Sequence, residues 1–526
     1  MVLRTREKMN RHEAISEDTE RDPLILGERL RERVLPFGWF ERRGADTVRF
    51  ITDHAGSVPL YYAQEQGRVL AGSTPLEVAR QVSAVTFDPV SVADFLLNGT
   101  VCYPYTLFKN VYAAPPGAVT EVTPYEVNSV TYYRPVEQVS NESVAYWGSH
   151  LREQVQKALL TGLEGKKNIK VLFSGGEDSR AVVSLLPAGL NCELITFADG
   201  YNREVRLAER AARALGRPLR FVKRPEGFYQ QKLSERVKLI GGVSDVRNTH
   251  VFGVLAEAVR DADAIVGGFT SDTLFKSLWK GNIETGLLRF GPEKLRQESA
   301  RELTGVKWLS PISWMRLEVA EAADARRWTL HEQIEEFRPT TAGNWHLMWP
   351  LGSHQPDYGH YLATKSVGPD VVEPFFSPQV YSLAARMPDA FRVDRRAFRA
   401  AFAPAMGKAG WLPTSSGRIP RLGGYLGHWV ELGTVVSRRL SDRATRVAAR
   451  IRGRAPMNQG AWSSTHPTSG PDLVAELSAS RLEHVRALLD QILTAKEADV
   501  FFKPGGGAAP DLVRNRLLQV AYLMDD

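Results

Sequence analysis

The stretch Val171-Leu172-Phe173-Ser174-Gly175-Gly176-Glu177-Asp178-Ser179-Arg180 joins an apolar, β-branched run to a helical pattern. Two glycines at the junction remove side chains where the backbone could pass close to a ligand. The N–H groups that open the helix would face an anion, and the Asp178 carboxylate beside them suits Mg²⁺. We therefore predict a pyrophosphate-binding loop with its own metal ligand. It is not a Walker A loop, because no lysine follows the glycines.

A second stretch, Asp263 to Phe275, has the same order of strand, glycine pair and aspartate at a helix start. Its Asp272 is far from Asp178 in sequence, so the two carboxylates can meet only through the fold. Two carboxylates that face one pyrophosphate can hold Mg²⁺, which makes them the predicted metal ligands. The alternative is that Asp272 or Ser271 only caps its helix. The residues predicted to bind the nucleotide are Leu172, Ser174, Gly175, Gly176, Asp178, Ser179, Phe197, Gly267 and Gly268.

The order of predicted elements divides the chain into three segments. Residues 1–22 are charged and lack apolar periodicity, which indicates a mobile tail. Residues 23–140 are β-rich, with strands expected at 48–52, 60–63, 68–72, 118–122 and 129–133 and helices at 76–81 and 89–97. In residues 141–526, helices at 144–161, 178–186, 203–215 and 249–260 alternate with strands at 168–173, 192–197, 219–223 and 264–268, and another helix opens near 271. This alternation predicts a doubly wound parallel sheet that binds its ligand at the carboxyl ends of the strands.

Composition indicates an ordinary globular protein. Of the 526 residues, 43% are hydrophobic and 24% are charged, which is typical usage. No run of eighteen apolar residues occurs, and the N-terminal residues lack the apolar core of a signal peptide, so we expect a cytoplasmic protein. The two cysteines, Cys102 and Cys192, are too few for a disulfide framework or a thiolate metal site.

The net charge of +7 is modest, but basic residues gather in residues 438–454. A nucleic-acid patch is one interpretation of that cluster. Since no aromatic side chains interleave for base stacking, we favour an amphipathic surface helix. Its predicted inner face consists of Leu440, Ala444, Val447, Ala448 and Ile451.

The full SGGxDS string resembles the pyrophosphate loop of the ATP pyrophosphatases, above all that of the asparagine synthetase family. Residues 267–275 are similar to that family's serine-glycine-glutamate-glycine-x-aspartate-glutamate-leucine-phenylalanine string. Residues 371–380 look like its arginine-x-proline-phenylalanine-leucine-aspartate segment, and residues 395–399 resemble its lysine-x-x-leucine-arginine step. In the first segment, residues 53–62 are similar to a hairpin of the glutaminase half, and Pro115-Pro116-Gly117 matches a later turn. The resemblance implies a degenerate N-terminal-nucleophile-type β-rich domain, followed by a synthetase domain with the doubly wound, adenine nucleotide α-hydrolase-like sheet of the ATP pyrophosphatases.

Two departures from the family pattern bear on the reaction. The glutaminase half uses an N-terminal cysteine whose α-amine activates the thiol, but position 2 here is Val2. We therefore expect no glutamine hydrolysis. In the second loop, Phe269 stands at the position where the family has its first glutamate and β-lactam synthetases have a tyrosine. Thr273 stands at the position of the family's second glutamate. Because Phe269 cannot exchange a proton, Asp357 is the candidate base by register, and His360 is a weaker one.

The family also uses a late lysine to stabilise the departing pyrophosphate. Arg418 lies where that lysine is expected, with Lys408 as the alternative. Either cation can neutralise charge on phosphate oxygens. Arg180, where the family usually has serine, is either a further cation near the loop or a solvent-exposed residue.

The resemblance implies a carbon–nitrogen ligase that uses ATP and Mg²⁺ and forms an acyl-adenylate. Without the cysteine, the amine is either free ammonia, as for an asparagine synthase fed from solution or by a partner, or an amino group of a larger substrate. The second option looks like β-lactam synthetases and lasso-peptide cyclases, and we favour it. We expect a substrate from natural-product or peptide metabolism and partner biosynthetic proteins, but neither membrane nor nucleic acid as a partner. A non-catalytic nucleotide-binding member and an enzyme that adenylates RNA bases are further alternatives.

Overall fold

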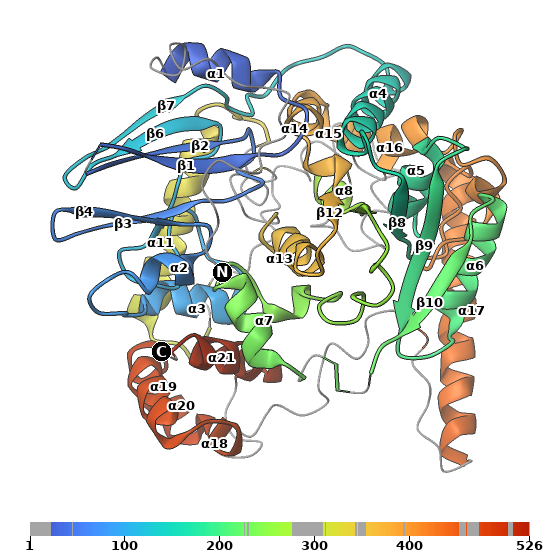
Figure 1. Ribbon diagram of the computed structural model, residues 1–526. Coiled ribbons are helices and arrows are strands. Elements are labelled where there is room, and N and C mark those ends of the chain that lie inside the picture. The colour runs from blue at the N-terminus through green and yellow to red at the C-terminus, as the bar shows by residue number, and fades with distance from the viewer. Residues whose placement is uncertain are drawn as a thin grey trace.

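The first part of the fold is a pair of antiparallel sheets. The computed structural model describes residues 23–44, 46–225, 227–228, 231–275, 309–310, 312–341, 345, 354–392, 395–451, 459, 473–502 and 509–524 (Figure 1). The larger sheet has the order β1-β2-β6-β7, formed by β1 (Gly38–Arg43), β2 (Thr47–Thr52), β6 (Ala118–Val122) and β7 (Val127–Thr131). The smaller has the order β4-β3-β5, formed by β3 (Tyr61–Glu65), β4 (Arg68–Gly72) and β5 (Tyr112–Ala113). Apolar side chains from both sheets, including Phe50, Val69 and Val122, form one core, and α1 (Pro23–Arg31) covers the other face of the larger sheet.

The two motifs of this first part that resemble the family, at residues 53–62 and 115–117, are hydrogen-bonded to each other. The Asp53 carboxylate accepts hydrogen bonds from the backbone N–H groups of Phe37, Ala55 and Ser57, at 3.0, 3.2 and 2.8 Å. The N–H of Gly117 donates to the Asp53 carbonyl at 2.7 Å. Asp53 therefore satisfies buried backbone N–H groups and connects its own turn to the Pro-Pro-Gly turn, because buried backbone groups need hydrogen-bond partners.

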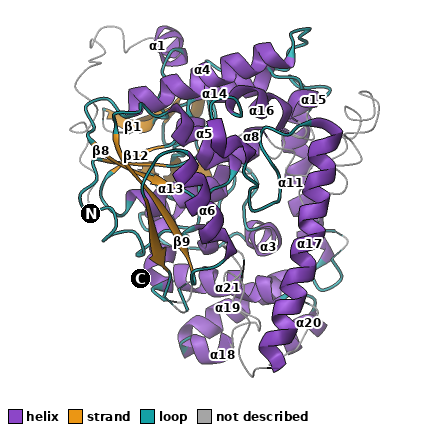
Figure 2. Cartoon of the chain, turned by 90° about the vertical axis from the view of Figure 1, so that its right-hand side faces the viewer, coloured by secondary structure: helices purple, strands orange, loops and turns teal. Residues whose placement is uncertain are grey.

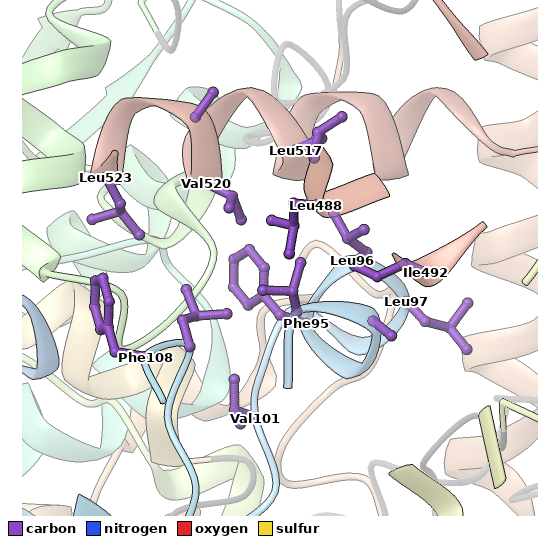
Figure 3. Packing of buried hydrophobic residues seen from close by; sticks show 14 of the residues in the cluster. Phe95, Leu96, Leu97, Val101, Phe108, Leu488, Ile492, Leu517, Val520 and Leu523 are labelled. Atoms are coloured by element: carbon purple, nitrogen blue, oxygen red, sulfur yellow. The ribbon is translucent and has the colours of Figure 1, made fainter. Parts of the chain in front are cut away.

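The last described helices return to this first part of the chain. They are α18 (Leu473–Glu476), α19 (Ala479–Ile492), α20 (Ala495–Phe501) and α21 (Asp511–Leu523). Figure 3 shows α19 and α21 packing on α3 (Pro89–Asn98), with Phe95 and Leu96 facing Leu488 and Val520. Both α2 (Pro75–Ala79) and α11 (Leu317–Glu335) add side chains to the same core. Each such side chain contributes roughly 1.5–3 kcal/mol on burial, so the C-terminal helices stabilise the N-terminal part.

The second part is built on five parallel strands in the order β10-β9-β8-β11-β12. They are β8 (Asn168–Leu172), β9 (Asn191–Ala198), β10 (Leu219–Lys223), β11 (Ala264–Val266) and β12 (Asp370–Val372). The chain moves outward from β8 to β10 and then crosses back to β11 on the other side of β8. The chain therefore continues from β8 and from β11 in opposite directions across the sheet, and such a switch point is where open α/β sheets bind ligands.

Helices cover both faces of the sheet, because successive strand residues point to opposite sides. Val171 and Leu194 pack on one side with α4 (Val144–Gly162), α5 (Glu177–Leu185), α6 (Arg203–Ala214), α14 (Pro378–Arg386) and α16 (Arg396–Phe402). Ile195 and Ile265 pack on the other with residues 251–259 and α13 (His354–Lys365). Figure 2 shows α5 and α6 in front of the strands. The remaining described elements are α7 (Leu233–Ile240), η2 (Val246–Asn248), α8 (Ser271–Phe275), η3 (Pro374–Phe376), α15 (Asp389–Arg392), η5 (Gly407–Trp411) and α17 (Gly424–Ile451).

The predicted parallel sheet is confirmed, and the bounds of its four predicted strands lie within two residues of the expected ones. The predicted helix at 249–260 is wrong: these residues form consecutive turns, and Gly253 within them has φ +75°, which a helix does not accommodate. The helices α1 and α7 and the strands β1, β5 and β12 were not predicted, and the segment boundaries at 22 and 140 stay predictions. No helix in the described ranges has the length and apolar character that crossing a membrane would need.

The predicted inner face of the basic helix is also wrong. The helix exists as the C-terminal half of α17, but Leu440, Ala444, Val447 and Ile451 are exposed, and the side chain of Ala448 lies outside the described residues. The reason is that α17 contacts the body of the protein through ion pairs on its polar face, such as that of Asp442 with Arg203 at 2.9 Å.

Candidate functional site

The first loop leaves β8 and opens directly into α5. Gly175 has φ +72°, and a Cβ on it would lie 2.8 Å from the Cα of Ala208 in α6. A side chain is therefore excluded by both conformation and packing. The Gly176 N–H donates to Ser174 Oγ at 3.2 Å, and Ser179 Oγ donates to the Gly176 carbonyl at 3.4 Å. These bonds fix the loop so that the first-turn N–H groups of α5 open at the carboxyl edge of the sheet.

The second loop leaves β11 and lies against the first. The Gly267 N–H donates to the Val372 carbonyl at 3.1 Å, and a Cβ on Gly267 would lie only 1.9 Å from Oε1 of Glu373. A Cβ on Gly268 would lie 3.6 Å from the Cβ of Asp178. Packing against Glu373 therefore excludes a side chain at Gly267, while a Cβ on Gly268 would make an ordinary van der Waals contact with the first loop.

Arg395 joins the two predicted metal ligands. Its guanidinium forms a hydrogen-bonded ion pair with Asp178 and lies 3.2 Å from Asp272 and 3.3 Å from Glu177. Burial lowers the pKa of Arg395, but the three carboxylates outweigh burial and raise that pKa above its ordinary value. The guanidinium also lies 3.9 Å from the ring centroid of Phe398. As predicted, Asp178 and Asp272 meet only through the fold, and one cation marks their meeting point.

Arg418 reaches the same cluster from the C-terminal side. Its guanidinium lies 3.8 Å from Glu177 and 3.3 Å from Glu431 of α17. The side chain is largely buried, whereas Lys408, the alternative late cation, is exposed in η5. Of the two candidates, Arg418 is therefore the one whose charge is held against the loop.

Arg180 is neither a further cation for the loop nor a solvent-exposed residue, which were the two expectations. It is fully buried and donates to the backbone carbonyls of Ala409 and Leu412 at 2.7 and 2.6 Å and to that of Pro413 at 2.9 Å. It therefore fastens the segment before Arg418 onto α5, because a buried guanidinium must satisfy its donors.

The wall beside the second loop is aromatic. Phe269 stacks on His360, with ring centroids 4.6 Å apart and planes inclined by 5°. The ring centroid of His250 lies 4.3 Å from that of His360. Burial lowers the pKa of His360 to about 3, so this ring is neutral near pH 7. The Phe269 N–H donates to Glu373 at 3.1 Å. The side chain of Asp357, the candidate base, lies outside the described residues.

The predicted nucleotide-binding residues at the strand ends lie side by side on one face of the sheet. Leu172 and Phe197 both belong to the apolar cluster on the α13 side, and both are partly exposed. Next to Phe197, the Arg224 guanidinium pairs with Asp199 at 2.8 Å. An apolar face beside fixed charges is a suitable surface for a purine base, and the nucleotide-binding role of these residues stays a prediction.

Arg395, Glu177 and Glu373 were not predicted as site residues. Arg395 had a detectable signal, because it occupies the first position of the step that resembles the family's lysine-x-x-leucine-arginine. Glu177 stands at the variable position of SGGxDS, and its contacts with two arginines depend on chain segments more than 200 residues away. Their positions follow from the tertiary fold and not from local sequence.

The carboxylates fit Mg²⁺ by their chemistry. Asp178 and Asp272 provide oxygen ligands on two facing loops, and their side chains are 26% and 44% exposed, so both remain accessible to a phosphate-bound ion. Mg²⁺ prefers one or two protein carboxylates together with phosphate oxygens. Among the described residues, no set of three or more His, Cys, Asp or Glu side chains is arranged to hold a metal, so a bound phosphate would have to complete the coordination.

Neither cysteine has the environment of a nucleophile. Both are buried and unpaired by disulfides. Burial raises the pKa of Cys102 to about 12 and that of Cys192 to about 11, and a protonated thiol is a poor nucleophile. Cys102 lies in an apolar core cluster, where a free cysteine acts as a small hydrophobic residue.

The paired loops with Asp178 and Asp272 lie at the switch point of a parallel sheet, which is where open α/β sheets bind ligands. The family model for asparagine synthase matches residues 150–455, which is more than half of the 526 residues. The chain therefore belongs to the asparagine synthase family and is an ATP-dependent amide ligase of that family. No curated protein gives a significant match to this sequence.

Proposed function

We propose that this protein activates a substrate carboxylate with ATP and transfers the acyl group to an amine larger than ammonia, without hydrolysing glutamine. The observation that carries the first half is the convergence of Asp178 and Asp272 on one guanidinium at the switch point. In this reaction a carboxylate oxygen attacks the α-phosphorus, the bond to the bridging oxygen breaks, and pyrophosphate leaves. The amine nitrogen then attacks the acyl carbon, and AMP departs with the C–O bonding electrons while the amine loses its proton.

The described residues can stabilise the first step electrostatically. In this proposal, loop N–H groups and the cations Arg395 and Arg418 would face the charge that grows on the departing pyrophosphate, and such preorganised groups act most strongly in a partly buried site. Mg²⁺, when held by Asp178 and Asp272, would neutralise further phosphate charge. Glu177 holds both arginines near the loop, which keeps two cations close together despite their mutual repulsion.

The choice of a large amine is supported by Phe269. Its ring replaces a carboxylate that would attract ammonium, and its stacking on His360 extends the apolar wall. A ligand that buries such a surface gains roughly 25 cal/mol per Å², whereas ammonia gains nothing from it. Natural-product or peptide chemistry, with a substrate that carries both a carboxylate and an amine, is the class that this wall fits.

The test is exchange of labelled pyrophosphate into ATP with a panel of carboxylic acids, followed by AMP and amide analysis with added amines. The panel contains aspartate with ammonia, β-amino acid derivatives, and peptides with acidic side chains. We expect exchange with a bulky acid or a peptide and amide formation with an amine of that class. Efficient asparagine formation from aspartate and ammonia would favour the ammonia-using alternative. ATP binding without exchange for any acid would favour the non-catalytic one.

A further inference from the structure

Helix α17 contacts the rest of the protein through its polar face. Glu431 pairs with Arg418 at 3.3 Å and Asp442 pairs with Arg203 at 2.9 Å. Between them, Arg438 donates to the Thr414 carbonyl at 2.9 Å. At about 100° per residue, these three positions fall within ~40° of one another around the helix. The inward face of α17 is therefore charged, which is the reverse of an ordinary surface helix.

The apolar side chains of α17 lie on the opposite side and face outward. They are Leu426, Trp429, Val436, Leu440, Val447 and Ile451, with 52% to 81% of each residue exposed. From Leu426 to Val447 the spacing of 3, 7, 4 and 7 residues keeps them at two positions of a coiled-coil heptad, and Ile451 falls at the flanking position next to these two. At about 100° per residue all six lie within an arc of ~80°. We call these six residues the outer stripe. Figure 1 shows the lower half of α17 standing apart from the other helices.

Charge is distributed unequally beside the outer stripe. Three exposed arginines lie on one side of the stripe: Arg443 is at its edge, and Arg439 and Arg446 are just beyond that edge. Ser437 and Ala444 lie at the opposite edge. The two acidic residues of α17, Glu431 and Asp442, are both on the inward face. The described outer face of the helix therefore combines an apolar seam with one positive edge.

We propose that the outer stripe binds an amphipathic helix of another protein, one that carries carboxylates along one edge of its apolar seam. An apolar seam only as wide as two heptad positions fits one partner helix. Arginines at the flanking positions select a partner by charge, because flanking residues set helix pairing. Such a partner would satisfy the positive edge as well as the exposed apolar side chains.

A second copy of this chain fits the stripe less well. In an antiparallel pair, Arg439 and Arg446 of one helix would face the same arginines of the other, and like charges repel. In a parallel pair they would face Ser437 and Ala444, which offer no charge. An anionic membrane is also disfavoured, because interfacial helices have a broad apolar face bordered by basic residues, whereas this stripe is narrow and has one basic edge.

The test uses a designed 28-residue helical peptide with leucine at the seam positions and glutamate at the flanking positions. A matched peptide has lysine in place of each glutamate. Fluorescence anisotropy with the full-length protein should show at least 10-fold tighter binding of the glutamate peptide. The double variant Leu440→Asp/Val447→Asp should weaken that binding at least 10-fold. Thr445→Asp, which changes an exposed residue of the same helix away from the stripe, should leave it unchanged.

Charge reversal separates this recognition from general stickiness. Arg439→Glu/Arg446→Glu should shift the preference toward the lysine peptide, and circular dichroism should show that every variant is folded. Equal binding of both peptides, or no binding of either, would overturn the proposal. Stripe-dependent cosedimentation with phosphatidylcholine/phosphatidylglycerol vesicles, without peptide preference, would assign the stripe to membranes instead. A dimer in analytical ultracentrifugation that the double variant abolishes would assign it to self-association.

Discussion

The guanidinium of Arg395 lies 3.2 Å from the carboxylate of Asp272 while it also contacts Asp178. These carboxylates leave different strands, and Arg395 comes from a third segment that begins α16. The site is therefore assembled with a positive charge already between the two predicted metal ligands. A phosphate-bound Mg²⁺ and Arg395 would bind the same two carboxylates, so substitution of the carboxylates and substitution of the arginine both test this arrangement.

The variants Asp178→Ala and Asp272→Ala should each abolish AMP formation while the protein stays folded. Both side chains are partly exposed at the strand ends, so their removal takes away phosphate and metal contacts without opening a core cavity. AMP release with a cognate substrate is the measurement, and circular dichroism checks the fold. Asp370→Ala, at the opposite end of β12, is the matched control and should keep its activity. Near wild-type turnover of either site variant would contradict the two-carboxylate site.

Replacing Arg395 should separate its charge from its shape. Arg395→Met should lower pyrophosphate exchange by roughly 10²- to 10³-fold, as loss of one preorganised charge does, and Arg395→Lys should retain part of the rate because it keeps a point charge. Without the guanidinium, Asp178, Asp272 and Glu177 repel one another. Added Mg²⁺ should therefore raise the melting temperature of Arg395→Met more than that of the wild type. Equal shifts in a thermal melt would mean that these carboxylates do not take up the ion.

The sequence predicted the parts of the site that are local. The SGG turn, the strand before it and Asp178 form one short stretch, and alternating strands and helices place this loop and Asp272 on one edge of a sheet. The partners of these residues could not be predicted, because a buried charge is balanced by whatever the tertiary fold brings near. Arg180 shows this most clearly: its neighbours in sequence suggest a phosphate cation, but its donors bind carbonyls near residue 410.

The difference between local signals and tertiary contacts also explains which helices and strands were predicted correctly. Strand 219–223 and helix 89–98 have local signals, including the Asp-Pro entry and the left-handed Gly99 that ends the helix. The segment 249–260 has a helical pattern but packs as turns on the sheet, where Gly253 adopts a positive φ. For α17, hydrophobic periodicity gave the correct helix and the wrong orientation, because the ion pairs of Glu431 and Asp442 decide which face is inward.

We expect no glutaminase activity from this chain. Burial raises the pKa of Cys102 to about 12, so fewer than roughly one thiol in 10⁴ is ionised at pH 7.5, and the protein interior excludes a substrate from it. Purified protein with glutamine, ATP and Mg²⁺ should release no more glutamate than buffer does. Cys102→Ala and Cys192→Ala should give the same background. Glutamate release that depends on either cysteine would require a nucleophile that the described structure does not expose.

His360 should contribute to a loss of stability in acid. Burial lowers the pKa of His360 from 6.5 to about 3, so the unfolded chain takes up a proton near pH 6.5 that the folded protein refuses. The stabilisation is fully present above pH 6.5 and is lost as the pH falls toward 3, by about 2 kcal/mol between pH 7.5 and 5. His360→Phe retains a stacking ring for Phe269 but cannot titrate. Urea denaturation at both pH values should show a smaller drop for the variant, and an equal drop would mean that His360 is protonated in the folded protein.

Phe269→Glu should weaken the native reaction without creating efficient asparagine synthesis. The ring of Phe269 stacks on His360 and its N–H donates to Glu373, so a glutamate would lose the stacked apolar surface and add a carboxylate near an existing one. Loss of that surface costs a bound acceptor on the order of 1.5–3 kcal/mol, which corresponds to roughly a 10- to 150-fold higher KM for a bulky amine. Thr273 would still occupy the position of the family's other glutamate, so ammonia would gain only one of two acidic partners. The measurement compares AMP formation with the native amine and with aspartate plus ammonia, and Phe269→Leu is the control that keeps an apolar side chain. If Phe269→Glu makes asparagine at a rate comparable to the native reaction, the aromatic wall does not select the acceptor.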